Sequence, residues 1–161
     1  KMKSSYIYVR LSNLSPSGVD LQSSADFETH FGQPIDLPPN SKVAVQRVNY
    51  ERSAVVTPTT TQQLFVVIND LNVKNFAIRP ASNNQTNKGS VIFAIGNMGD
   101  PDVFIEEDPF EKVFFDMENN STSTFNSMFA RIVDERGSPA TSFLSGLTSI
   151  DLIFEVQEGL E

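Results

Sequence analysis

The residues that could do acid–base or metal chemistry are few in this sequence. The only histidine is His30 and there is no cysteine, which removes thiolate nucleophiles and thiolate zinc sites. A histidine-dependent hydrolase would need His30 to meet a serine and an acid, yet no G-x-S-x-G nucleophile elbow occurs. We therefore interpret His30 as a polar strand residue beside Phe31, and a histidine metal site would lack a second histidine.

Carboxylates gather in two places, at Glu106-Glu107-Asp108 and at Asp134-Glu135. Such clusters can form a calcium site or the carboxylate pair of a glycosidase, but they are more often solvated charges in turns. Neither cluster has the D-x-D-x-D-G spacing of an EF-hand loop, which favours turns. We predict no catalytic residue, no metal and no cofactor, and hence a protein that is not an enzyme.

Composition excludes other classes of function. The chain has 161 residues, net charge -8 and a predicted pI of about 4.6. An acidic chain repels phosphate backbones, so we expect no nucleic-acid partner. No run approaches the roughly 20 apolar residues of a membrane helix, so we expect no membrane insertion. The length fits one domain over residues 1–161.

Aromatic side chains outside the expected core are the remaining feature that could carry function. Two of them alternate with the apolar residues of the first expected strand, and three lie near the acidic turn: Tyr6, Tyr8, Phe104, Phe110 and Phe114. Aromatic residues are enriched in subunit interfaces, although a β-sandwich also simply contains phenylalanine. Both interpretations stay open, and these five are the candidate interface residues.

The stretch 31–50 (FGQPIDLPPNSKVAVQRVNY) predicts how these residues are positioned. Pro38-Pro39-Asn40 forms a rigid corner, because proline cannot donate to a sheet ladder. After the corner, residues 42–50 alternate as a half-buried strand does. The alternation predicts Val43, Val45 and Arg47 on one face, with Ala44, Gln46, Val48 and Tyr50 on the other.

Further short strands are predicted along the chain, between turns rich in Pro, Gly, Asn and Ser. We expect them at 4–14, 24–31, 63–69, 73–78, 90–95, 103–105, 112–117 and 149–157, with loops at 52–61, 79–89, 96–102, 118–124 and 134–139. Residues 125–133 also fit an apolar helical stripe, but we favour a strand. Eight or nine strands indicate an all-β fold, an eight-stranded antiparallel β-sandwich of the single jelly-roll type.

Four asparagines match the N-glycosylation acceptor pattern: Asn13, Asn84, Asn119 and Asn120. The start of the chain lacks the apolar segment of a secretory signal. In a chain rich in Asn, Ser and Thr, such matches are expected by chance.

Three stretches give the chain a resemblance to single jelly-roll capsid proteins of double-jelly-roll DNA viruses (virophages, polinton-like viruses and giant-virus relatives). They are residues 31–50, the run 132–137 (IVDERG), and Phe143-Leu144-Ser145-Gly146 followed by the closing strand SIDLIFEV. Their order and spacing carry the resemblance. The sequence departs from it at Lys42, where relatives often show Trp.

The resemblance implies a structural protein of the virion, made in the host cytoplasm. Such a protein forms the vertex penton as a ring of five, or is a minor capsid protein that binds between capsomers of the major capsid protein. Its partners would be copies of itself, as a homo-pentamer or a trimer, and the major capsid protein. Cyclic symmetry requires two different contact patches on each subunit.

Two other classes remain open. A receptor- or carbohydrate-binding head would need an exposed aromatic near polar loop residues, for which Phe104 with Asn97 and Asp102 is the candidate. A carboxylate hydrolase would need two acids, such as Glu106 and Asp134, converging about 5–9 Å apart in a cleft.

Overall fold

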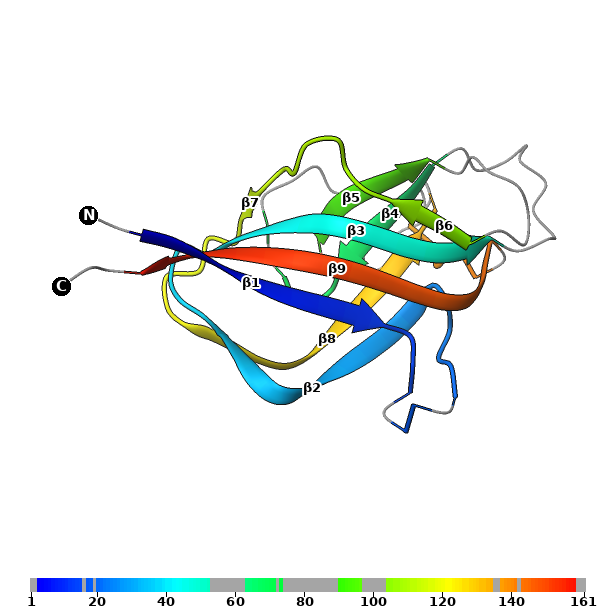
Figure 1. Cartoon of the computed structure of the whole chain (residues 1–161), viewed down its shortest axis with the longest axis horizontal. Helices are drawn as coiled ribbons and strands as arrows, with labels where there is room; N and C mark the ends of the chain where they lie inside the picture. The colour runs from blue at the N-terminus through cyan, green and yellow to red at the C-terminus, as the bar shows by residue number, and fades with distance from the viewer. Residues whose placement is uncertain are drawn as a thin grey trace.

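The structure is a computed structural model that describes residues 3–15, 17–18, 20–52, 63–71, 73, 90–96, 104–134, 137–141 and 143–158. These residues form nine strands and no helix, arranged as two antiparallel sheets (Figure 1). The predicted strand 73–78 beyond Val73 and the predicted loops 79–89 and 96–102 beyond Gly96 lie outside the described residues, as does the loop 52–61 beyond Arg52.

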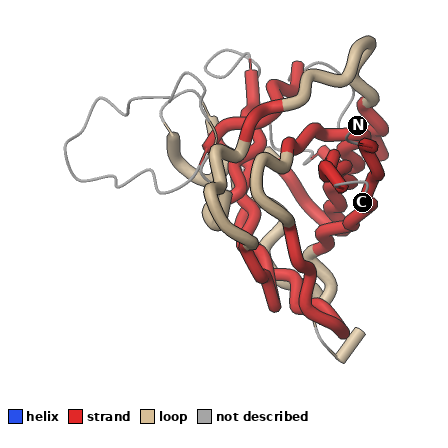
Figure 2. The backbone as a smooth tube through the Cα atoms, turned by 90° about the vertical axis from the view of Figure 1, so that its left-hand side faces the viewer, coloured by secondary structure: helices blue, strands red, loops and turns tan. Residues whose placement is uncertain are grey.

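The first sheet contains, in spatial order, β1 (Lys3–Ser12), β9 (Leu144–Glu158), β3 (Lys42–Arg52) and β6 (Phe104–Glu107), and β7 (Phe115–Asp116) also pairs with β3. The second sheet contains β2 (Asp26–Leu37), β8 (Ser123–Val133), β4 (Gln63–Ile68) and β5 (Ser90–Gly96). The two sheets form the two layers seen in Figure 2.

The strand pairing is that of a jelly roll. Because β6 and β7 both pair with β3, they act as one interrupted strand, which leaves eight strands in two sheets of four. The pairs are nested: β1 with β9, β2 with β8, β3 with β6, and β4 with β5. Two Greek keys wound in this way define the jelly roll. The predicted all-β, eight-stranded sandwich is confirmed.

The core lies between the sheets and is built by period-two alternation. In β1, Val9 and Leu11 are buried and Ile7 packs against the same core, as predicted. Aliphatic and aromatic side chains from every long strand complete the core, the largest fully buried ones including Tyr50, Phe27, Phe154, Leu37, Leu64, Met128 and Ile132. Burial of this apolar surface is the main force that holds the sandwich together.

The alternation predicted for β3 is wrong beyond Val45. Val45 pairs with Leu152 and Arg47 with Asp151, so Gln46 is an extra residue on β3. Such a β-bulge reverses which side chains face inward. Val48 and Tyr50 therefore join Val43 and Val45 in one core, instead of lying on the opposite face.

The predicted corner at Pro38-Pro39-Asn40 is confirmed, and Asn119 holds it. Its Oδ1 accepts a hydrogen bond from the Ser41 amide (3.1 Å), while its Nδ2 donates to the carbonyls of Leu37 (3.2 Å) and Pro38 (2.7 Å). Its own carbonyl accepts from the Asn40 amide (3.0 Å). Asn40 adopts a φ of 60°, which asparagine tolerates better than most residues.

The strand predicted at 125–133 is confirmed as part of β8, so the helical interpretation is rejected. The strand predicted at 24–31 continues to Leu37, with irregular pairing between His30 and Ile35. The closing strand begins at Leu144 rather than at residue 149. The strand predicted at 112–117 is wrong in extent, because only Phe115–Asp116 pairs with β3.

At the other end of the sandwich, the fully buried Asn13 joins three segments. Its Nδ2 donates to the carbonyls of Gly146 (2.8 Å) and Gln22 (3.2 Å), and its Oδ1 accepts from the Thr148 amide (2.8 Å). Gly146 has a φ of 64°, and a Cβ there would collide with the Glu51 carboxylate. Asn13 is therefore structural and unsuited to glycosylation.

Candidate assembly surface

All of the candidate interface residues lie on or beside one side of the molecule, the outer face of the first sheet. Alternation along β1 places Tyr6 and Tyr8 there, because Ile7 and Val9 point into the core. Alternation along β6 places Phe104 on the same face, since Ile105 packs against the core. Tyr6, Tyr8 and Phe104 are 52%, 66% and 55% exposed.

The segment between β6 and β7 crosses beside this face. Phe110 and Lys112 line a hollow with Gln46 and Arg47 of β3, and the Phe110 ring is fully exposed. Phe114 is half-buried, and its ring centroid lies 6.4 Å from that of Tyr6. The structure thus brings Phe114 to Tyr6, which sequence separation alone did not indicate.

The outer face is apolar beside Tyr8. Ile153 pairs with both Tyr8 and Ala44. Ile153 (3% exposed) and Ala44 (0%) are buried, yet neither belongs to the core between the sheets. Ile153 interrupts the alternation of buried and less buried side chains along β9. The register explains this interruption, because Ile153 lies between Tyr8 and Ala44, where the outer face is apolar.

A row of charges crosses the same face next to the aromatic residues. Arg10 binds Asp151 through two hydrogen bonds (2.7 and 3.1 Å). Arg47, which pairs with Asp151 in the ladder, binds Glu106 (3.0 Å) and Asp108 (2.8 Å). Exposed ion pairs of this kind contribute little to stability. They fix the orientation of these charged side chains on the outer face.

The acidic cluster at 106–108 is divided between two sides of β6. Glu106 and Asp108 share Arg47 on the surface, and the hydrogen bond from Arg47 lowers the pKa of Asp108. Glu107 faces inward, where burial raises its pKa and the Tyr50 hydroxyl lies 3.5 Å from its Oε1. Burial likewise raises the pKa of Tyr50. The three carboxylates do not converge on one cleft.

The second acidic cluster shapes a turn. Asp134 Oδ1 accepts a hydrogen bond from the Ser138 amide (3.1 Å), and its carbonyl accepts from the Gly137 amide (3.0 Å). Glu135 lies outside the described residues. In the part of the chain that the structure describes, no group of three His, Asp or Glu side chains could hold a metal ion.

His30 lies on the outside of the second sheet and is exposed. Its Nε2 is 3.7 Å from Glu28 Oε1, the same oxygen that accepts a hydrogen bond from the Ser127 hydroxyl (2.8 Å). In a catalytic triad the histidine stands between the serine and the acid. Here the acid stands between the other two, which is the arrangement of a surface hydrogen-bond network.

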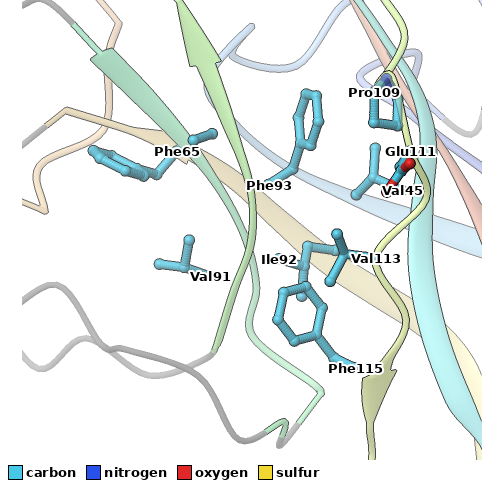
Figure 3. A pocket seen from close by; sticks show the side chains of 10 residues that line it. Val45, Phe65, Val91, Ile92, Phe93, Pro109, Glu111, Val113 and Phe115 are labelled. Atoms are coloured by element: carbon cyan, nitrogen blue, oxygen red, sulfur yellow. The ribbon is translucent and has the colours of Figure 1, made fainter.

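A pocket of about 350 Å³ opens where the chain leaves β3 between β6 and β7. Figure 3 shows Phe93, Val113, Phe115 and Val45 in the gap between β5 and the segment 109–115. This pocket was not predictable from the periodicity of the sequence, which indicated an unbroken strand at 112–117. Pro109, which cannot donate to a ladder, was the signal for the interruption.

Asn97 and Asp102, the two polar residues predicted to accompany Phe104 in a binding head, lie outside the described residues. Within the described ranges, no helix has the length and apolar character needed to cross a membrane.

No family model and no curated protein matches the chain. Among solved structures, the chain is similar to one in the structure of infectious bursal disease virus, Gx strain, at 12% identity and a TM-score of 0.31, covering 99% of this chain and 33% of that one. A chain of the Gt strain of the same virus gives 12% identity and a TM-score of 0.29, covering 97% and 32%. This protein thus spans about a third of the length of either chain. At these values the assignment of a jelly roll rests on the strand order alone.

Proposed function

We propose that the protein is a structural subunit of an icosahedral viral shell, a penton or minor capsid protein, that assembles through its first sheet. The observation that carries this proposal is the gathering of exposed aromatic side chains on and beside the outer face of that sheet. Aromatic residues are enriched in protein–protein interfaces, and four of these side chains are more than half exposed. The resemblance of three stretches to single jelly-roll capsid proteins supports the same conclusion.

The available area is consistent with a subunit interface. A stable interface buries about 800 Å² on each partner, and fully burying one aromatic side chain removes about 150–250 Å². Tyr8, Phe104 and Phe110, with Tyr6 and its neighbour Phe114, would supply a large share of that area. The charge row through Arg10, Asp151 and Arg47 would form the polar rim that such interfaces carry.

The proposed partners are further copies of this chain, in a ring of five or a trimer, and the major capsid protein. The proposed location is the virion. Closed rings need two different contact patches, so one subunit presents the aromatic face and its neighbour presents another surface. The fold by itself does not select this function, because jelly rolls serve many.

The test is the molar mass in solution, measured by light scattering and sedimentation over a concentration series. We expect the wild type to form a discrete oligomer, which would be a pentamer for a penton. The double variant Tyr8→Ala/Phe104→Ala should be monomeric under the same conditions. His30→Ala, an exposed change on the second sheet, is the matched control and should leave the mass unchanged. A wild-type chain that stays monomeric, alone and with the major capsid protein, would contradict the proposal.

A second candidate, a carbohydrate-binding head, is favoured by one specific observation. A hollow of about 270 Å³ on the outer face is lined by Tyr8, Arg10, Gln46 and Asp151. An aromatic ring beside amide, guanidinium and carboxylate groups is suited to stacking and hydrogen bonding with a sugar. A glycan array would test it: binding that Tyr8→Ala and Gln46→Ala both abolish would support this candidate over assembly, and no binding would remove it.

A further inference from the structure

We propose that Phe110 of one subunit inserts into the pocket between β5 and the segment 109–115 of the next subunit. This inference rests on the proposed self-assembly and specifies one of its contacts. The chain carries both halves of the contact, an apolar pocket and a fully exposed aromatic ring, on the interrupted strand between β6 and β7.

The pocket is suited to an aromatic side chain. Its walls come from β3, β4, β5 and the segment 109–115, and all of its lining residues except Glu111 are apolar. Its volume is about 350 Å³, whereas a cavity of about 150 Å³ already accommodates benzene. Water binds weakly in such a pocket, because few polar groups are there to form hydrogen bonds with it. A ring that enters it would replace water with dispersion contacts.

Phe110 is suited to fill such a pocket but cannot fill the one beside it without a rearrangement. Glu111, Val113 and Phe115 line the pocket, Phe110 and Lys112 line the hollow on the outer face, and Pro109 borders both. The segment thus alternates like a strand, and Phe110 points to the opposite side from the pocket. Its ring is fully exposed, so it is available to a neighbouring molecule.

This alternation also determines the kind of interface. Because ring and pocket lie on opposite sides of one segment, the contact joins two different patches. Such a heterologous contact is the type that generates rings. The charges agree: Lys112 lies on the side of the inserting ring and Glu111 at the pocket. Insertion would bring Lys112 of one subunit towards Glu111 of the next.

The test uses two complementary variants of the full chain. Phe110→Ala removes the ring and keeps the pocket, while Ala94→Trp fills the pocket from its exposed lining residue and keeps the ring. Each variant alone should raise the dissociation constant of the oligomer by at least about 30-fold, the effect of an interface hot spot. Mixed one to one, they should form a heterodimer, since one ring and one pocket remain.

A charge exchange tests the same contact independently of pocket filling. Glu111→Lys and Lys112→Glu should each weaken association, and the double variant should restore it. Thermal midpoints equal to that of the wild type, measured at concentrations where all proteins are monomeric, would show that the variants fold. The inference would be overturned if Phe110→Ala and Ala94→Trp assembled like the wild type, or if their mixture gave no heterodimer. Either result would leave the proposed function standing. A wild type that never assembles would overturn both.

Discussion

Asn119 should be among the most important polar residues for the stability of this fold. Its side chain has four hydrogen-bond partners: Oδ1 accepts from the Ser41 amide, and the two hydrogens of Nδ2 are shared among the carbonyls of Leu37, Pro38 and Ser121. Each such bond contributes about 0.5–1.5 kcal/mol net. The bond to Ser121 is exposed, and the Pro38 carbonyl also accepts from the Ser41 hydroxyl (2.6 Å), so the full sum does not apply. We expect Asn119→Ala to cost about 2 kcal/mol.

For a domain of this size that loss lowers the melting temperature by about 4–8 °C. The assay is urea unfolding followed by tyrosine fluorescence, since Tyr50 is buried and the chain has no tryptophan. Asn120→Ala, an exposed neighbour in the same loop, is the control and should change stability by less than about 0.5 kcal/mol. Equal midpoints for Asn119→Ala and Asn120→Ala would refute the role assigned to Asn119.

Asn119→Asp adds a dependence on pH. The carboxylate would face the Leu37 and Pro38 carbonyls that now accept from Nδ2, which should raise its pKa in the folded state above the unfolded value of about 3.9. A group with a raised folded pKa loses stability as the pH rises. The variant should therefore be least stable near pH 7 and should approach Asn119→Ala, or exceed it, near pH 4. A deficit independent of pH would contradict this geometry.

Two further predictions concern single residues. Gly146→Ala should destabilise the fold by about 1–3 kcal/mol, because its φ of 64° disfavours a side chain and the new Cβ would displace the Glu51 carboxylate. Adding Glu51→Ala should remove the clash but not the backbone strain, so it should recover only part of this loss in urea unfolding. Burial raises the pKa of Glu107 in the folded state, so its ionisation destabilises the fold as the pH rises above the ordinary value of 4.5. Glu107→Gln should therefore gain stability over the wild type at pH 7 but not at pH 4, and an equal difference at both pH values would disprove the assignment.

The strands were predictable where local pattern and tertiary environment agree. The alternation of β1 placed Tyr6 and Tyr8 outside correctly, because one side of that strand packs on the core and the other does not. The corner at Pro38-Pro39-Asn40 followed from the restricted backbone of proline. Residues 125–133 satisfied two periodicities, and their place in the centre of the second sheet between β2 and β4 selects the strand.

What was not predictable depends on contacts between distant residues. The bulge at Gln46 exists because β3 must match the register of β9, which lies about 100 residues further along the chain. The interruption between β6 and β7, which creates the pocket, depends on where β3 offers a free edge. The meeting of Phe114 with Tyr6 likewise results from topology. Single-sequence periodicity contains none of this information.

The order of strands has a consequence for how the chain reaches its native state. β9 lies between β1 and β3, and β8 lies between β2 and β4, so the two strands made last occupy the middle of the two sheets (Figure 1). During synthesis, the second sheet cannot close until β8 has left the ribosome, and the first cannot close until β9 has. Folding must then join Lys3 to Glu158, a contact between the two ends of the described chain, and such non-local pairing is slow.

Until that moment, β1 and β3 expose unpaired edges and the apolar faces of Leu11 and Val43, so nascent or refolding chains would be prone to aggregate. A domain of this topology should fold in one late and cooperative step, with a yield that depends strongly on concentration.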